Sequence, residues 1–139
     1  MAGLLAGFLQ EQARTPFVWG ASDCALFLAD WVRLATGIET ADDLRGQYDG
    51  PRSAAEVSGG SLAFVVGRCA ARAGLKNTED AKPGDIAVLK QPRGEVCAIR
   101  TPTGWAMRDR RCIYVAPVAD VPVLECWKVP QWLRSSQSS

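Results

Sequence analysis

The spacing of hydrophobic residues changes at about residue 82, and this change limits the fold more than any other feature of the sequence. Before it, apolar side chains recur every three or four residues, as on one face of a helix. After it, short apolar runs are separated by Gly, Pro and charged residues, as in β-strands. Helices therefore come first and strands second. This order favours an α+β domain, with N-terminal helices packed on a small antiparallel β-sheet, over alternating βαβ units.

Residues that favour helix ends bound three predicted helices. Pro16 ends the first, Ser22 is the expected N-cap of the second, and Gly74 follows the third. The second and third are expected over about residues 23–35 and 61–73, with shorter helical pieces at 41–47 and 54–57. After a turn at residues 82–85, strands are expected over 86–89, 95–101, 104–108, 112–116 and 123–129.

Length and composition favour one compact domain. The chain has 139 residues, of which 47% are hydrophobic, enough to bury a core without cross-links. We expect a single domain over residues 1–133 and a flexible tail over 134–139. Trp127 and Trp132 near its end either join the core or offer aromatic anchors to a partner. The formal net charge of +1 argues against nucleic acid or a membrane surface as a partner.

The five cysteines occur at scattered positions without a C-x-x-C pair. An odd number and this spacing argue against a disulfide framework and against a zinc site, so we expect no metal and no cofactor. The apolar stretch at residues 1–9 lacks the basic start of a signal peptide and is too short to span a membrane. We therefore expect synthesis and folding in the cytoplasm.

Cys24 is the residue with the clearest chemical potential. It follows Asp23 in the first turn of the second predicted helix, after a tight loop. Unpaired backbone N–H groups and the positive end of the helix dipole favour thiolate over thiol at such a position. Cys24 is therefore the candidate nucleophile. The alternative is a buried structural cysteine, because Cys24 shares a helical face with Phe27 and Trp31.

The sequence around Cys24 resembles the NlpC/P60 family of papain-like cysteine hydrolases. Trp19-Gly20 followed by Asp23-Cys24 matches the family's N-terminal motif, and the run 83–85, Pro-Gly-Asp, matches the turn that leads into its sheet. The resemblance implies a papain-like fold. It also implies that Cys24 and Asp23 belong to the former catalytic site and that Trp19 and Gly20 line its cleft.

The catalytic base of that family is missing here. The chain contains no histidine, and alignment to the family places Val96 at the base position and Met107 or Arg108 at the orienting position. Thiol chemistry needs a group that takes and returns a proton near neutral pH, which none of these side chains does. We therefore expect no catalysis, unless a carboxylate with a raised pKa, a water or a partner's histidine replaces the base.

The chain also resembles small phage and prophage proteins that carry a decayed form of this site. This resemblance implies a structural component of a phage tail, at the tail tip or hub, made in the host cytoplasm and incorporated into the virion. The partners implied are other tail proteins and peptidoglycan fragments. Two alternatives stay open: a cysteine peptidase or amidase that cleaves peptidoglycan stem peptides through Cys24, and a peptide-binding module that uses the former cleft.

Overall fold

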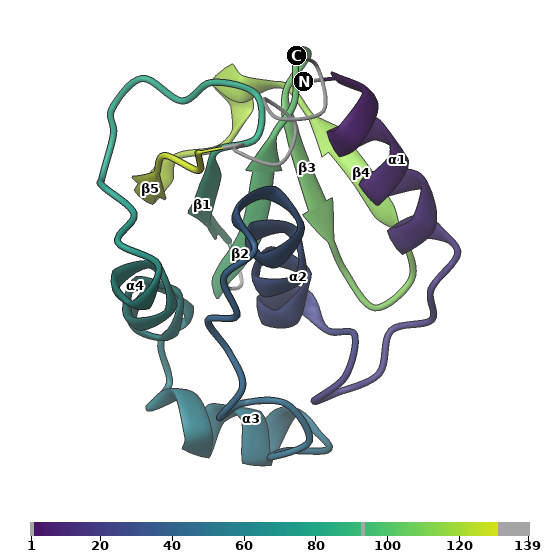
Figure 1. Ribbon diagram of the computed structural model, residues 1–139. Coiled ribbons are helices and arrows are strands. Elements are labelled where there is room, and N and C mark those ends of the chain that lie inside the picture. Colours follow the sequence, from purple (N-terminus) through teal and green to yellow (C-terminus); the bar gives the residue numbers. More distant parts are fainter. Residues whose placement is uncertain (1, 93, 131–139) are drawn as a thin grey trace.

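The computed structural model describes residues 2–92 and 94–130, and within them four helices and a five-stranded sheet form one α+β unit (Figure 1). The predicted tail at 134–139 and Trp132 lie outside the described residues. The helices are α1 (Ala2–Ala13), α2 (Cys24–Thr36), α3 (Pro51–Ser58) and α4 (Leu62–Arg72). The strands are β1 (Ile86–Gln91), β2 (Gly94–Arg100), β3 (Trp105–Arg108), β4 (Ile113–Ala116) and β5 (Val123–Trp127). The predicted order of helices before strands is confirmed.

The strands pair in the order β4-β3-β2-β1-β5, and every pair is antiparallel. The first four strands are neighbours in the sheet in the order in which they follow along the chain. Strand β5 returns to pair with the edge of β1 that β2 leaves open. The register sets Val88 opposite Cys97 and Ile86 opposite Trp127. Strand β2 therefore lies in the middle of the sheet, where its alternate side chains reach both faces.

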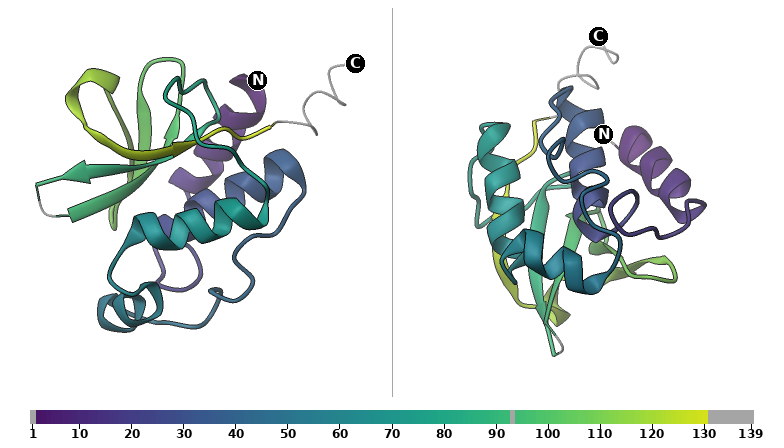
Figure 2. Two further views of the ribbon diagram at one scale, coloured as in Figure 1. Left: turned by 90° about the vertical axis from the view of Figure 1, so that its left-hand side faces the viewer. Right: turned by 90° about the horizontal axis from the view of Figure 1, so that it is seen from below.

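One face of the sheet is covered by helices, with α2 lying between α1 and α4 (Figures 1 and 2). The main apolar core fills this interface, and it includes Phe27 and Trp31 from α2, Cys97 and Ile99 from β2, and Trp127 from β5. Helix α2 is buried on several sides because a second cluster packs on its other flank. Trp127 thus belongs to the core.

The other face of the sheet carries a separate apolar cluster. Leu89, Val96, Trp105 and Met107 are all buried within it. These residues alternate along the strands with those that face the helices, which is the period of two expected for a strand. The side to which each β2 residue points is therefore fixed by packing on both faces.

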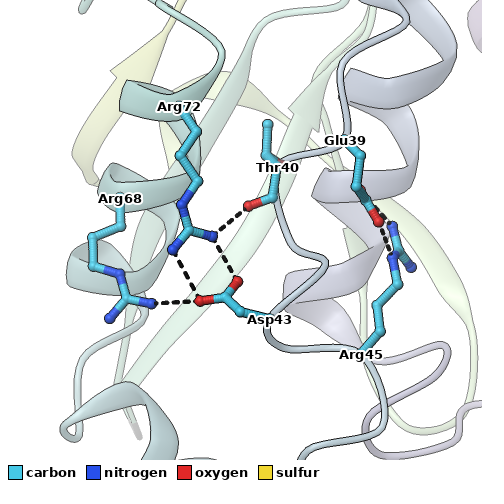
Figure 3. Close-up of polar contacts among 6 residues, drawn as sticks. All are labelled: Glu39, Thr40, Asp43, Arg45, Arg68 and Arg72. Carbon is cyan, nitrogen blue, oxygen red and sulfur yellow. Dashed lines mark hydrogen bonds and ion pairs between the residues drawn. The ribbon is translucent and has the colours of Figure 1, made fainter.

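Ion pairs tie the segment between α2 and α3 to its neighbours (Figure 3). Asp43 accepts hydrogen bonds from two residues of α4, Arg72 at 2.6 and 2.9 Å and Arg68 at 3.3 Å (Figure 3). Arg45 pairs with Asp30 of α2 at 2.8 Å and, within the segment, with Glu39 at 2.5 Å. The helical piece predicted at 41–47 is only a turn, because Gly46 adopts a left-handed φ of 73° that ends it. The other short piece, at 54–57, lies within α3.

Candidate functional site around Cys24

Asp23 is the N-cap of α2. Its Oδ1 accepts a hydrogen bond from the Leu26 N–H at 3.0 Å. The predicted cap, Ser22, is wrong by one position: its hydroxyl donates to the Pro16 carbonyl at 2.5 Å and accepts from the Val18 N–H at 3.0 Å. Both residue types cap helices well, so the choice between them is made by the loop that Ser22 closes.

The second carboxylate oxygen of Asp23 fixes the loop before Cys24. Oδ2 accepts hydrogen bonds from the Gly20 N–H at 2.8 Å and from the Tyr48 hydroxyl at 2.5 Å. Asp23 is 1% exposed, so all three donors replace water around a buried carboxylate. Burial, with the hydrogen bond to Asp23, raises the pKa of Tyr48, which keeps its hydroxyl protonated as a donor. Asp23 therefore fixes the loop before Cys24 and the start of α2 relative to each other.

Gly20 is required by a close backbone contact. It has a φ of 79°, and a Cβ added there would lie 2.2 Å from the carbonyl oxygen of Tyr48. Its own carbonyl accepts a hydrogen bond from the Gly46 N–H at 2.8 Å. The role predicted for Gly20, lining the cleft, is thus replaced by a packing role against residues 46–48.

The Cys97 thiol on β2 has the largest effect on the pKa of the Cys24 thiol, through a side-chain hydrogen bond. This hydrogen bond, helped by the backbone N–H groups of Cys24 and Ala25, lowers the pKa of Cys24 against the opposing effects of burial and Asp23. The same contact, together with complete burial, raises the pKa of Cys97. The pair therefore favours a Cys24 thiolate that accepts a hydrogen bond from a protonated Cys97.

Val96 does not face Cys24. It packs with Leu89 and Trp105 on the far side of the sheet, and the β2 side chains that face the helices include those of Glu95, Cys97 and Ile99. The prediction that Val96 occupies the base position is therefore wrong by one residue. An offset of one residue moves a side chain to the opposite face of a strand. The next residue along β2, Cys97, has its thiol on the side of the sheet that faces the helices.

Arg108 joins the sheet to the end of α1. Its Nη1 and Nη2 donate hydrogen bonds of 2.7 Å each to the carbonyls of Gln12 and Thr15, and its guanidinium stacks 5.8 Å from the centre of the Phe17 ring. Arg108 is 3% exposed, and these hydrogen bonds take the place of water at its two terminal nitrogens, whereas its buried Nε has no hydrogen-bond partner among the described residues. Met107, the other candidate for the orienting position, lies on the far face with Val96. The predicted orienting position thus holds a structural residue.

A cavity of about 270 Å³ opens beside Cys24. Its walls include Trp19, Asp23, Cys24, Tyr48 and Glu95. Glu95 also accepts hydrogen bonds from the Ala63 N–H at 3.2 Å and the Ser61 hydroxyl at 3.5 Å, at the start of α4. The sequence reading missed Tyr48, Glu95 and Cys97. The alternation along β2 could have revealed the last two, whereas Tyr48 has no local signal.

A metal-binding cluster and a membrane-spanning helix are both absent from residues 2–92 and 94–130. No three His, Cys, Asp or Glu side chains cluster there closely enough to hold a metal ion. Within the same residues, no helix has both the length and the apolar character needed to cross a bilayer.

The comparisons with known proteins identify a family without a described activity. Neither the curated proteins nor the solved structures gave a match. The family model described as "Domain of unknown function (DUF6950)" matches residues 2–129, which is nearly the whole chain. The chain therefore belongs to the DUF6950 family.

Proposed function

We propose that the chain is a structural component of a phage or prophage-derived tail, at the tip or hub, built on a catalytically silent, papain-like fold of the NlpC/P60 type. The observation that carries the proposal is the setting of Cys24, which begins the capped helix α2 beside a cavity, with Cys97 as the β2 residue that acts on its pKa. A hydrolase would need a proton acceptor at that place, and the chain has a second thiol and no histidine.

The protonation state of the Cys97 thiol argues against its acting as a catalytic base. Its raised pKa keeps the thiol protonated, so it donates to Cys24 and does not take a proton from it. The nearby carboxylates have other partners. Asp23 accepts three hydrogen bonds, and Glu95 binds the start of α4. These contacts support an architectural role for the residues around the former nucleophile.

The order of the elements supports the NlpC/P60-type fold. Trp19 and Gly20 precede a helix that begins at Cys24, and that helix packs on the antiparallel sheet through β2. The Pro83-Gly84-Asp85 turn precedes β1, and the Asp85 N–H donates to the Lys82 carbonyl at 2.9 Å. Trp31 fastens α2 to this turn, because its Nε1 donates to the Gly84 carbonyl at 2.7 Å.

Two measurements test the proposal. Purified protein incubated with peptidoglycan is expected to release no stem-peptide fragments, in an assay where an active NlpC/P60 hydrolase does release them. In a prophage that carries the gene, purified tails are expected to contain the chain, and Cys24→Ser is expected to leave tail assembly intact. Cleavage that disappears in Cys24→Ser, or normal tails that lack the chain, would refute the proposal.

An active cysteine peptidase or amidase is the second candidate, because Cys24 and Glu95 line one cavity and the pKa of Cys24 is lowered. In this mechanism the carboxylate of Glu95, directly or through a water, would return the proton to the leaving amine. Stem-peptide cleavage that is lost in both Cys24→Ser and Glu95→Gln would establish this candidate. Cleavage that persists in Glu95→Gln would exclude Glu95 from the reaction.

A further inference from the structure

A second cavity, of about 610 Å³, lies on the far face of the sheet, away from Cys24. Its volume is in the range of sites that bind small molecules. We propose that this cavity binds an apolar peptide with free ends, about three residues long. The carboxylate of the peptide lies at Trp105 and Arg100, and its ammonium group lies at Glu79 and Glu125. This inference does not rest on the proposed tail function.

The indole N–H of Trp105 lacks an acceptor. Trp105 is 1% exposed, and its Nε1 is buried without a hydrogen-bond partner among the described residues. A buried donor without a partner costs free energy, and native proteins contain few of them. Because Trp105 forms part of the cavity wall, an acceptor atom bound in the cavity would satisfy this donor.

Arg100 adds a positive charge next to Trp105. The two residues are cross-strand partners on β2 and β3, so their side chains lie on the same face of the sheet. Nη1 of Arg100 donates hydrogen bonds to the carbonyls of Thr101 and Gly104, whereas its Nε and Nη2 have no acceptor among the described residues. A guanidinium beside an indole N–H suits a carboxylate, which accepts several hydrogen bonds.

Two carboxylates lie on another side of the cavity, beside β5. Glu125 belongs to this strand, and Glu79 belongs to the segment that runs along it (Figure 1). Glu79 is exposed, and Glu125 accepts a hydrogen bond from the neutral Asn77 amide at 3.0 Å. The third carboxylate of the wall, that of Asp80, already pairs with Lys82 at 3.0 Å. Glu79 and Glu125 therefore attract an ammonium group and repel a second carboxylate.

The spacing of the strands sets the length of the ligand. Strands β2 and β5 pair with opposite edges of β1, so they lie two strand spacings apart, roughly 10 Å. An extended peptide of about three residues spans the same distance. The wall also carries apolar side chains that are 41–48% exposed, those of Val118, Val123 and Leu124. Burial of this surface favours apolar side chains in the peptide.

The test uses tri-leucine as the probe, titrated into the isotope-labelled full chain. NMR follows the indole N–H of Trp105, identified as the resonance that Trp105→Phe removes. Tri-leucine is expected to shift this resonance and to bind with a Kd below about 1 mM. Tri-leucine with an acetylated N-terminus or an amidated C-terminus lacks one charge. Each is expected to bind about tenfold more weakly, because one hydrogen bond between charged groups is lost.

Variants assign the carboxylate end. Arg100→Gln is expected to bind tri-leucine about tenfold more weakly and to bind the amidated peptide as the parent does. Arg52→Gln, at an exposed position on α3 outside the cavity, is the matched control and is expected to bind both peptides as the parent does. If Trp105→Phe does not fold, calorimetry on the parent and Arg100→Gln decides the matter.

Three results would each overturn the proposal. The first is the absence of any binding of tri-leucine at about 10 mM. The second is equal affinity for the free and the capped peptides, which would mean that the free ends are not recognised. The third is an Arg100→Gln variant that binds tri-leucine as tightly as the parent does.

Discussion

The hydroxyl of Tyr48 donates a 2.5 Å hydrogen bond to Oδ2 of Asp23. Asp23 lies 25 positions before Tyr48 in the chain and is the N-cap of α2, the helix that begins at Cys24. This contact joins the segment between α2 and α3 to the loop before Cys24. The ion pairs of Asp43 and Arg45 hold the same segment against α4 and α2. The position of Cys24 thus depends on residues distant in sequence.

Loss of the Tyr48 hydroxyl is expected to destabilise the fold. Tyr48→Phe removes one of the three donors to a buried carboxylate, and a hydrogen bond to a charged group contributes about 1.5–3 kcal/mol. The free energy of unfolding, measured by urea titration, is expected to fall by about that amount. Tyr114→Phe is the matched control, because Tyr114 is half-buried and its hydroxyl accepts a 3.3 Å hydrogen bond from the neutral Gln91 amide. Equal losses in the two variants would contradict the role of Tyr48.

Gly20 is expected to tolerate no side chain. In Gly20→Ala the new Cβ would lie 2.2 Å from a backbone oxygen, at a φ of 79° that alanine rarely adopts. We expect a loss of at least about 2 kcal/mol in the free energy of unfolding, or a failure to fold. Gly7→Ala, in α1 with nothing within 4 Å of the added Cβ, is expected to gain up to about 1 kcal/mol in the same thermal or urea unfolding measurement. A stable Gly20→Ala would contradict the close contact.

Local signals were sufficient for most of the fold. The turn at residues 82–85 and the end of α2 at Gly37 were predictable, because Pro and Gly restrict the backbone at their own positions. The choice between Ser22 and Asp23 as cap was not, since both have suitable side chains. Contacts with Pro16 and Tyr48, which no local pattern encodes, decide it.

The candidate site was predictable only in part. Cys24 was identifiable because the start of a helix has a recognisable sequence and a known effect on thiols. The residue opposite it was not, because a position aligned by resemblance has an uncertainty of one residue, enough to exchange Val96 for Cys97. Because β2 is buried on both faces, neighbouring residues along its middle are all apolar. The sequence pattern therefore does not show which of them face the helices.

Alkylation should distinguish Cys24 from the other half-buried cysteine. The pKa of Cys24 is lowered chiefly by the Cys97 thiol, whereas burial raises the pKa of Cys69. In a pH series with iodoacetamide, followed by peptide mass spectrometry, Cys24 is therefore expected to reach its half-maximal rate at a lower pH than Cys69. A common midpoint for the two thiols would contradict this expectation and would also weaken the enzyme candidate.

Two substitutions of Cys97 test the cause of that shift. Cys97→Ser keeps a hydrogen-bond donor beside Cys24, whereas Cys97→Ala removes it. The rate of Cys24 alkylation at neutral pH is expected to fall several-fold in Cys97→Ala and to fall less in Cys97→Ser, because only the alanine variant leaves the thiolate without that donor. Circular dichroism checks that both variants fold. Equal rates in the two folded variants would assign the shift to the backbone N–H groups instead.

Carboxylates between α2 and α3 should give the stability a dependence on acid pH. The hydrogen bonds from Arg72 lower the pKa of Asp43, and those from Arg45 lower the pKa of Glu39. A lowered pKa in the folded state stabilises the fold above the group's ordinary pKa, and this stabilisation is lost as the pH falls through the folded-state value. Asp30 acts in the opposite direction, because burial outweighs Arg45 and raises its pKa.

Asp43→Asn is expected to flatten the loss of stability on acidification from about pH 5 to pH 2.5, because the group that gains a proton is gone. The side chains of Asp43 and Arg72 are 48% and 41% exposed, so solvent screening limits the effect to under about 1 kcal/mol at neutral pH. Urea unfolding at several pH values measures it, and about 1 M salt should shrink the difference between variant and parent. Asp42→Asn removes the same charge from an exposed neighbour and is the matched control. If the two variants have identical pH profiles, the cluster of Asp43 with Arg68 and Arg72 does not stabilise the segment that carries Tyr48.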